Sequence, residues 1–403
     1  MFIPDYVKNV TEILYAAGEE AFLVGGCVRD AIMGKLPHDY DIAVSCVPER
    51  TEELFDGFRV IETGIRHGTV TVVSGGNNLE LTTFRIDGEY RDNRRPESVS
   101  FTRSIVDDLA RRDFTANAIA YSEKTGFVDP FGGRDDIKKG LIRCVGEPDR
   151  RFNEDALRIV RGMRFASVLG FDIDKETAEG MIRNRALLNN IAGERIFSEL
   201  KKLLVGKKST ETLVRFDDVM CEIFPELLTL DAKNRRTAYE HTGGAMHPET
   251  GFAAVFYGVS TADVTRALSR LKTDRAFSDT VLLLIVCGEN YDSGSASLAV
   301  GEKGKTAYLR LFAGKHGAKK TELLAELLRL TRGEEPTAEQ FIADGCRGAV
   351  SAGSLEVGGS EMKALGKTGE QIGKALERLA VLVALGEVPN ERNALLDAAQ
   401  SDI

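Results

Sequence analysis

Short apolar runs rich in β-branched residues gather in the first third of this 403-residue chain. The runs AFLV, DIAV, GTVTVV and LELTTF are separated by Gly and Asn, and they follow a helical pattern from Asp5 to Ala17. This alternation predicts a mixed α/β region. After Asp136 apolar residues recur at three- and four-residue spacing and strand patterns are few, which predicts that the rest of the chain is helical.

The length of the chain favours more than one domain. Within the helical part the composition shifts at Gly206 to Ser209, and again from Asn290 to Lys305, a stretch rich in Gly, Ser and Asn. Clusters of such residues mark connections between helices. We therefore expect four parts: a head at 1–138, a neck at 139–205, a body at 206–310 and a tail at 311–403.

The sequence shows no sign of membrane insertion or export. No apolar stretch approaches the roughly 18 residues that a membrane span needs, and the N-terminus, MFIPDYVKNVTEIL, lacks the layout of a signal peptide. The six cysteines lie far apart without a C-x-x-C pair, so neither a disulfide framework nor a zinc site is indicated. We expect a cytoplasmic protein with reduced thiols.

The overall charge argues against a nucleic-acid partner, but its distribution does not. The net charge is −9 and the pI is about 5.4, whereas phosphate-binding proteins usually carry a basic footprint. From Arg134 to Arg164, however, nine Lys and Arg residues face six acidic ones. A local basic strip can therefore coexist with an acidic whole.

Two motifs in the first region favour binding of phosphate and metal. Gly25 and Gly26 follow an apolar run in LVGGCVRD, so backbone N–H groups can approach phosphate oxygens, and Arg29 can add a charged contact. In the extended segment HDYDIA, Asp39 and Asp41 point to the same face and can hold one or two hard cations such as Mg²⁺. A D-x-D in an exposed loop or helix cap is the alternative, and the nearby glycine motif disfavours it.

A third motif, RFNEDALRIVRGMRFA, places polar residues at every third position of a predicted helix, namely Asp155, Arg158, Arg161 and Arg164. An ion pair followed by solvated arginines is the simplest interpretation. Cytosine and adenine, however, both present an amino donor beside a ring-nitrogen acceptor, whereas uracil and guanine present the reverse order. An accepting Asp155 and a donating Arg158 can therefore select cytosine and adenine without a template.

These motifs stand in the order found in the class II tRNA nucleotidyltransferases and bacterial poly(A) polymerases of the polymerase-β superfamily, which the chain resembles. The segment DLARRDFTANA is similar to the family signature in which an arginine and an aspartate contact the sugar and phosphates. This implies that Arg112 and Asp113 bind the nucleotide. Related polymerases have a third carboxylate on a neighbouring strand; Glu80 is the candidate, and an outward-facing strand glutamate is an equal alternative.

Further segments extend the resemblance into the helical part. DPFGGRDD is similar to the motif that joins head to neck, where Gly and Pro suit a turn. GERIFSEL looks like the family's fifth motif, in which Glu194 and Arg195 either support the base-reading helix or cap their own helix. Arg161 and Arg164 resemble the family's additional nucleotide contacts.

Two more segments bear on the substrate. The charged loop between Arg85 and Phe101 resembles one kept by relatives that add a terminal A, although a purely structural surface loop remains an alternative; the matching residues are Tyr90, Asp92, Arg94 and Pro96. LEVGG, LGKTGEQIG and Pro389-Asn390 look like the tail of short bacterial CCA-adding enzymes. Glycines that start helices leave N–H groups free for phosphate, which implies contact with the tRNA elbow. Ser360-Glu361 departs from the tail pattern.

The resemblance implies an α+β fold, with a polymerase-β-like nucleotidyltransferase head built on a mixed sheet and all-α neck, body and tail domains. The expected catalytic residues are Asp39, Asp41 and Glu80, with Asp39 and Asp41 as ligands of Mg²⁺. The expected nucleotide-binding residues are Gly26, Arg29, Arg112, Asp113, Asp155, Arg158, Arg161 and Arg164.

The expected reaction is template-independent addition of C, C and A to the 3′ end of tRNA from CTP and ATP, by attack of the 3′-hydroxyl on the α-phosphate. An A-adding tRNA nucleotidyltransferase or a poly(A) polymerase shares most of these motifs. A non-catalytic RNA-binding adaptor is the alternative from another class, and the intact metal-spaced carboxylates disfavour it. The expected partners are the 3′ end and elbow of tRNA, CTP and ATP; the sequence does not indicate an oligomeric state.

Overall fold

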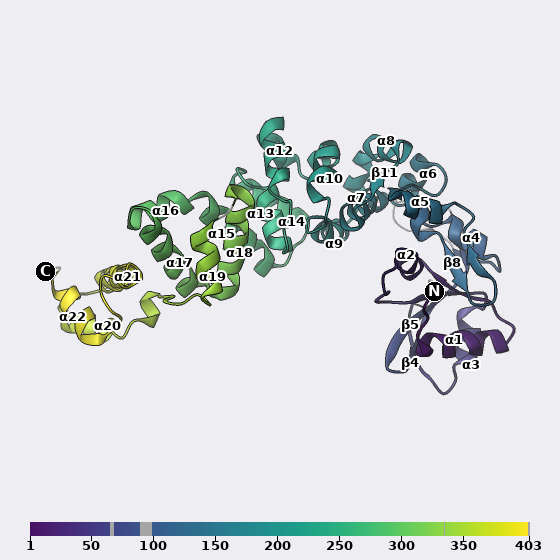
Figure 1. Ribbon diagram of the computed structural model, residues 1–403, viewed down its shortest axis with the longest axis horizontal. Coiled ribbons are helices and arrows are strands. Elements are labelled where there is room, and N and C mark those ends of the chain that lie inside the picture. The colour runs from purple at the N-terminus through teal and green to yellow at the C-terminus, as the bar shows by residue number, and fades with distance from the viewer. Residues whose placement is uncertain (65–67, 89–98, 334, 402–403) are drawn as a thin grey trace. The chain divides into compact units, whose positions relative to one another are not determined.

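The structure is a computed structural model that describes residues 1–64, 68–88, 99–333 and 335–401. The chain divides into two compact units, Met1–Pro225 and Glu226–Ile403. Figure 1 labels their helices and strands. The loop residues Tyr90, Asp92, Arg94 and Pro96 lie outside the described residues.

A mixed sheet forms the framework of the first unit, as the sequence predicts. In the described part of the chain it has seven strands in the order β3-β4-β5-β2-β1-β8-β9. The strands are β1 (Ala21–Val24), β2 (Asp41–Val44), β3 (Arg59–Gly64), β4 (Thr69–Ser74), β5 (Asn77–Thr83), β8 (Ala120–Ser122) and β9 (Gly126–Val128). The pair β2 and β5 is parallel, and the other neighbours are antiparallel. Two short strands beside the sheet, β6 (Arg85–Asp87) and β7 (Val99–Phe101), form an antiparallel pair.

The strand β1, which lies inside the sheet between β2 and β8, is buried along its whole length because helices cover both faces of the sheet. All four residues of its AFLV run are buried. Phe22 and Val24 pack with Ile105 and Leu109 of α4 (Ile105–Ala110). The helix α1 (Asp5–Ala16) lies against β1 and β4 and buries its apolar side there. A strand that is covered on both faces therefore carries a fully apolar run, whereas a strand with one face in solvent alternates apolar and polar residues.

Helices complete the first unit. They are α2 (Gly26–Ile32), α3 (Pro48–Leu54), η2 (Thr115–Asn117), α5 (Gly133–Lys139), α6 (Pro148–Glu154), α7 (Leu157–Leu169), α8 (Lys175–Arg183), η3 (Arg185–Asn190), α9 (Gly193–Leu203), α10 (Ser209–Arg215) and α11 (Asp217–Ile223). One parallel pair of two-residue strands, β10 (Leu141–Ile142) and β11 (Asp172–Ile173), lies where the sequence predicts only helices.

Asp155 does not lie on the helix that carries Arg158, Arg161 and Arg164, so that expectation is wrong. Helix α6 ends at Glu154, Asp155 is extended (φ −140°, ψ 103°), and α7 starts at Leu157. The side chain of Asp155 accepts a hydrogen bond from the backbone N–H of Leu157 at 3.1 Å. Aspartate competes with the helical backbone in this way, which explains why the helix breaks at this residue.

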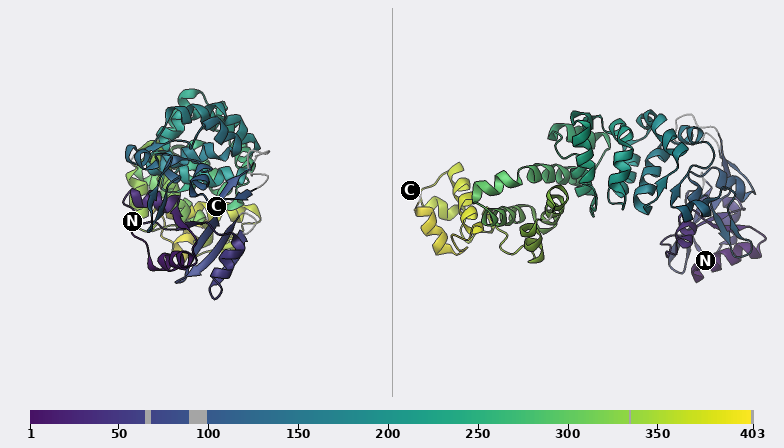
Figure 2. Two further views of the ribbon diagram at one scale, coloured as in Figure 1. Left: turned by 90° about the vertical axis from the view of Figure 1, so that its right-hand side faces the viewer. Right: turned by 45° about the horizontal axis from the view of Figure 1, so that its top comes forward.

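The second unit is helical among its described residues, as the right-hand view of Figure 2 shows. Its elements are η4 (Pro225–Thr229, which starts at the last residue of the first unit), α12 (Ala232–Glu240), α13 (Pro248–Val255), α14 (Thr261–Arg270), α15 (Arg275–Glu289), α16 (Tyr291–Leu298), α17 (Glu302–His316), α18 (Ala318–Arg332), α19 (Pro336–Ala343), η5 (Ala352–Ser354), α20 (Gly359–Ala364), α21 (Glu370–Ala384) and α22 (Arg392–Gln400). No described helix in either unit is long and apolar enough to cross a membrane.

The tail motif has its own small core and a capped helix start. Met362 and Leu379 are buried in a cluster that joins α20, α21 and α22. At the start of α20 the N–H of Gly358 donates to Glu361 Oε2 at 3.0 Å, and the hydroxyl of Ser360 donates to the same oxygen at 2.8 Å. The expectation that a glycine leaves this N–H group free for phosphate is therefore wrong at Gly358.

Candidate active site

A glycine turn opens the site at the end of β1. Gly25 has φ 73° and ψ −128°, a conformation that glycine adopts without strain. A Cβ atom at Gly25 would lie 3.1 Å from Arg112 Nη1 and 4.0 Å from Asp41 Oδ2. The absence of a side chain therefore lets the backbone lie against a cation and a carboxylate, next to Gly26 at the start of α2.

Cys27, inside the same motif, has a structural role. Its side chain is buried and its thiol donates to the carbonyl oxygen of Val24 at 3.2 Å. Burial raises the pKa of the thiol to about 11. Cys27 therefore stays protonated at neutral pH and packs beneath the turn.

Asp41 lines the pocket, and the carboxylates of Asp39 and Glu80 lie near enough to Asp41 to act on it. Asp41 is the first residue of β2 and is the register partner of Glu80 on the parallel strand β5, so the two side chains share a face of the sheet. Asp39 lies in the bend just before β2 rather than in the strand. Asp39 and Asp41 are exposed while Tyr40 is buried, the alternation that the D-x-D pattern predicts.

The electrostatics of Asp41 fit a cation site. Asp41 is open to solvent, but protein atoms packed around its carboxyl group partly desolvate it and raise its pKa; Glu80 and Asp39 raise it further, and Arg112 opposes them. Mutual repulsion of carboxylates is relieved by a bound divalent cation, and an oxygen-only donor set suits a hard one. Within the described residues no group of three or more His, Cys, Asp or Glu side chains is arranged so that it could hold a metal ion. An open carboxylate pair leaves ligand positions for water and substrate oxygens.

Arg29 and Arg112 both donate to Asn117, Arg29 to its side-chain amide and Arg112 to its backbone carbonyl. Arg29 Nη1 donates to Asn117 Oδ1 at 2.8 Å, and its Nε and Nη2 donate to Asp30. Arg112 Nη1 donates to the backbone oxygen of Asn117 at 3.4 Å, and Nη2 donates to the buried Asp108 at 3.3 Å. The Nε of Arg112 is buried without a hydrogen-bond partner among the described residues. Arg112 therefore retains a donor.

Asp113 binds Arg161 in this structure. Its Oδ2 accepts from Arg161 Nε at 2.8 Å and Nη2 at 2.6 Å, and its Oδ1 accepts from the N–H of Phe114 and from Asn117 Nδ2. Burial alone would raise the pKa of Asp113, but Arg161, Arg158 and Asn117 together lower it to about 2. Asp113 is therefore an ionised carboxylate at the floor of the pocket.

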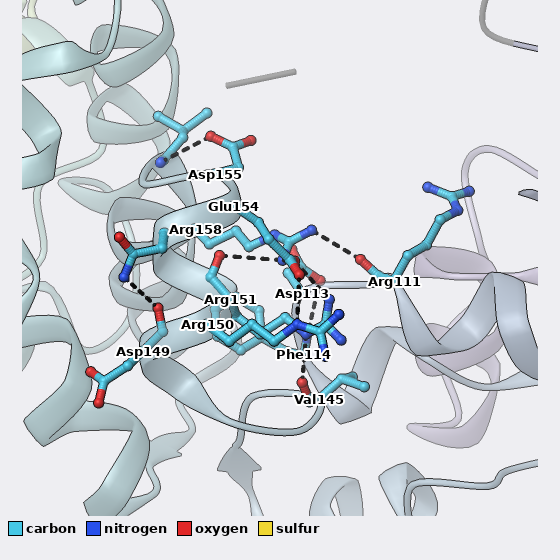
Figure 3. A network of polar contacts seen from close by, with 12 residues as sticks. Arg111, Asp113, Phe114, Val145, Asp149, Arg150, Arg151, Glu154, Asp155 and Arg158 are labelled. Carbon is cyan, nitrogen blue, oxygen red and sulfur yellow. Dashed lines mark hydrogen bonds and ion pairs between the residues drawn. The ribbon is translucent and has the colours of Figure 1, made fainter. Parts of the chain in front are cut away.

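Asp155 and Arg158 are each held by other residues and not by each other in the described part of the chain. Asp155 Oδ2 accepts from Arg195 Nη2 at 2.9 Å. Arg158 is 8% exposed; its Nη1 donates to Glu154 Oε2 at 2.7 Å and its Nη2 to the backbone oxygen of Arg111 at 2.9 Å. Figure 3 shows Arg158 between these two partners. The alternative of an Asp155–Arg158 ion pair with solvated arginines is therefore wrong.

Glu154 is a supporting residue that the sequence analysis missed. Its carboxylate pairs with Arg150 at 3.3 Å, with Arg151 at 2.7 Å and with Arg158 at 2.7 Å. The spacing of three and four residues along the chain is the signal that could have identified it. Glu199 is a second such residue: its Oε2 lies 2.5 Å from Arg164 Nε, in an ion pair without hydrogen-bond geometry.

One pocket of ≈ 500 Å³ collects most of the predicted site. The predicted residues that line it are Gly26, Arg29, Asp41, Arg112, Asp113, Asp155, Arg158, Arg161 and Arg164. The remaining lining residues are Gly25, Arg111, Asn117, Leu157, Phe165 and Arg195. Asp39 and Glu80 do not line it, although both act on Asp41.

The pocket is strongly basic in an acidic chain. Seven arginines and three aspartates line it. Arg164 stacks on Phe165, with Cζ 3.7 Å from the ring centroid. Arginines in this density suit a polyanion such as a triphosphate. The arginines, the carboxylate of Asp41, and the acceptor Asp155 with the donor Arg158 thus line one pocket.

Comparisons with known proteins agree with this arrangement. The family described as "Poly A polymerase head domain" matches residues 21–143, and "Probable RNA and SrmB- binding site of polymerase A" matches 170–229. The CCA-adding enzyme of Lactiplantibacillus plantarum is 35% identical over 410 aligned residues, which cover 98% of this chain and 95% of that protein. The CCA-adding enzyme of Limosilactobacillus fermentum is 52% identical over 191 residues, or 47% of each chain.

Solved structures show the same fold. The Bacillus stearothermophilus CCA-adding enzyme in complex with CTP aligns with a TM-score of 0.80 at 28% identity, covering 100% of this chain and 98% of that chain. The Thermotoga maritima CCA-adding enzyme complexed with tRNA aligns with a TM-score of 0.67 at 18% identity, covering 100% and 96%. The α+β fold predicted from the sequence is confirmed.

Proposed function

The chain belongs to the family of CCA-adding enzymes, and from this premise we propose that it adds C, C and A to the 3′ end of tRNA from CTP and ATP without a nucleic-acid template. One observation carries the proposal: the carboxylate of Asp41 and the side chains of Asp155 and Arg158 line a single pocket. A nucleotide bound there meets the reacting centre at one end and a base-reading pair at the other.

Base selection rests on Asp155 and Arg158. An ionised Asp155 can only accept and Arg158 can only donate, which matches the Watson–Crick edges of cytosine and adenine. Arg195, Glu154 and the Arg111 carbonyl hold the two side chains in place before a nucleotide arrives. Uracil and guanine present their donor and acceptor groups in the reverse order and would leave buried groups unpaired, at a cost of about 1–3 kcal/mol for each group.

The triphosphate occupies the arginine-rich part of the pocket in this proposal. Gly26 allows close approach of the backbone, and the cations are supplied by Arg29, Arg112, Arg161 and Arg164. Asp113 keeps Arg161 in place through its two hydrogen bonds. These residues would hold the nucleotide and then the departing pyrophosphate. The 3′-hydroxyl oxygen of the RNA, as it loses its proton, bonds to the α-phosphorus, and the bond from that phosphorus to the α–β bridging oxygen breaks.

Nucleotidyltransferases of this family use divalent metal ions, and we propose Mg²⁺, with Asp39 and Asp41 as its ligands and Glu80 as the third catalytic carboxylate. The mutual repulsion around Asp41 supports this assignment. When bound, such ions lower the pKa of the attacking hydroxyl and neutralise charge on the leaving group. Asp41 and Glu80, as register partners on β2 and β5, would fix the position of the reacting end.

We also propose a separate role for each of the four parts of the chain. We infer catalysis in the head (1–138), base recognition in the neck (139–205), a connecting body (206–310) and contact with the tRNA elbow in the tail (311–403). A tRNA substrate agrees with a cytoplasmic location.

Extension of tRNA at one-nucleotide resolution tests the reaction. The purified chain is incubated with Mg²⁺ and a tRNA that ends at the discriminator base, with CTP, ATP or both. Two added nucleotides with CTP and three with both are expected. Growth only on a tRNA that already ends in CC would instead indicate an A-adding enzyme, long ladders a poly(A) polymerase, and no growth on any end a non-catalytic RNA-binding protein.

A further inference from the structure

One buried residue, Asn117, contacts three of the residues that we assign to nucleotide binding, two through its side-chain amide and one through its backbone oxygen. Asn117, in η2, is 8% exposed. Its Oδ1 accepts from Arg29 Nη1 at 2.8 Å, and its Nδ2 donates to Asp113 Oδ1 at 3.2 Å. Its backbone oxygen accepts from Arg112 Nη1 at 3.4 Å. We propose that Asn117 is a positioning residue that sets the arginines of the pocket before the nucleotide binds; this rests on the function proposed above.

The partners of Asn117 fix the orientation of its amide. A guanidinium has only donors, so Arg29 must face the amide oxygen. An ionised Asp113 has only acceptors, so it must face the amide nitrogen. A carboxylate in place of the amide could receive Arg29 but could not donate to Asp113. An amide is therefore the group that this position requires on chemical grounds.

Asn117 acts across elements that are distant in the sequence. Arg29 comes from α2, Arg112 follows α4, and Asp113 in turn holds Arg161 of α7. Loss of the side-chain amide would thus release Arg29 and remove one of the hydrogen bonds that hold Asp113, the partner of Arg161. Pre-set donors lower the cost of ordering side chains when a ligand binds.

The backbone that carries Asn117 is itself fixed. The hydroxyl of Thr115 in η2 donates to the fully buried Asp136 of α5 at 2.6 Å. A Cβ atom at Gly133 would lie 2.1 Å from the carbonyl oxygen of Thr115, so α5 and η2 pack in direct backbone contact. The position of the amide is therefore set by the fold and does not depend on a bound nucleotide.

Two substitutions separate a bridging amide from a side chain that only fills space. Asn117→Asp keeps the shape and the acceptor for Arg29 but loses the donor and turns a second carboxylate toward Asp113. Asn117→Ser loses both contacts without adding charge. If the bridge matters, Asn117→Asp is at least as damaging as Asn117→Ser; if only packing matters, the isosteric Asn117→Asp is the milder change.

The control is Asn189→Asp. The Nδ2 of Asn189 also donates to a carboxylate, Glu222 Oε1, at 2.6 Å, but on the exposed surface outside the pocket. The same chemical change is thus made without touching the site. We expect its kinetics to match those of the unmodified chain within about twofold, because exposed pairs contribute little.

The experiment measures KM for CTP and KM for tRNA separately in the extension assay, together with the melting temperature. Both Asn117 variants are expected to raise KM for CTP by about 10- to 100-fold, the effect of a lost contact to a charged group. KM for tRNA should change by less than about twofold. A milder effect of Asn117→Asp than of Asn117→Ser, or an equal rise in both KM values, would overturn the proposal.

A double substitution covers the case in which Asn117→Asp does not fold. Because Asn117 acts in part through Arg29, the combined loss in Asn117→Ser with Arg29→Ala should be smaller than the product of the two single losses. Fully additive losses would contradict the proposal. Failure of the proposed function would look different, since the unmodified chain would then extend no tRNA at all.

Discussion

Arg195 Nη2 donates to Asp155 Oδ2 at 2.9 Å, and the two residues stand forty positions apart in the chain. Arg195 belongs to the first turn of α9, while Asp155 lies in the break between α6 and α7. The N–H of Leu157 holds the other oxygen of Asp155 at 3.1 Å. The carboxylate that we propose to read the base is therefore fixed from both sides, and α9 contributes to base selection without reading the base itself.

Removal of Arg195 should loosen base selection. Arg195→Ala leaves Asp155 with its backbone contact alone, so we expect kcat/KM for CTP to fall about tenfold, the effect of one charge-assisted hydrogen bond. Arg195→Lys should recover part of this loss because it restores the charge but not the planar fork. The kcat/KM values for CTP and UTP, measured at steady state in both variants, give the loss in Arg195→Ala and the recovery in Arg195→Lys. Unchanged kinetics in Arg195→Ala would show that Asp155 needs no such support.

Removal of the Asp41 carboxylate, which we propose as a metal ligand, should stop the reaction and leave RNA binding intact. Asp41→Asn keeps the size of the side chain but removes its charge, and we expect transfer to fall by more than about 1,000-fold. A filter-binding assay should show tRNA affinity within about twofold of the unmodified chain. Asp56→Asn, an exposed residue after α3, is the matched control. Turnover retained by Asp41→Asn would refute the metal assignment.

The ionisation of Asp113 should make the free energy of unfolding depend on pH in the acid range. Its pKa in the folded chain is about 2, against an ordinary value of 3.8. A lowered pKa stabilises the fold above the unfolded value, and this contribution is lost as the pH falls from about 4 toward about 2, by about 2 kcal/mol. Urea unfolding across this range measures the loss. Asp113→Asn should start less stable but show a shallower pH dependence; identical slopes in the two proteins would contradict this.

The sequence predicts the strands and the carboxylate pattern well because both follow local rules. The runs AFLV and DIAV correspond to β1 and β2. Alternation along the extended segment exposes the side chains of Asp39 and Asp41 and buries that of Tyr40. The sequence alone does not decide whether Glu80 is a third catalytic carboxylate or an outward-facing glutamate on a strand. Its placement beside Asp41 depends on strand pairing between β2 and β5, which is a tertiary property.

The supporting residues were harder to predict because their contacts join distant segments. Asp155 was expected to share a helix face with Arg158, but its side chain caps the backbone before the helix starts, and its partner is Arg195. Asn117 stands inside a recognised motif, yet nothing in the sequence shows that Arg29 lies 2.8 Å from its amide. Such contacts follow from packing of α2, η2 and α7, which periodicity does not determine.

The most direct test of the account is the preference of the enzyme for CTP over UTP when Arg158 is removed. The kcat/KM values for both nucleotides are measured in the unmodified chain and in Arg158→Ala, on tRNA that ends at the discriminator base. Loss of one buried donor should lower the CTP/UTP ratio by about 10- to 100-fold. An unchanged ratio would mean that Asp155 and Arg158 do not select the base, and would contradict the central claim.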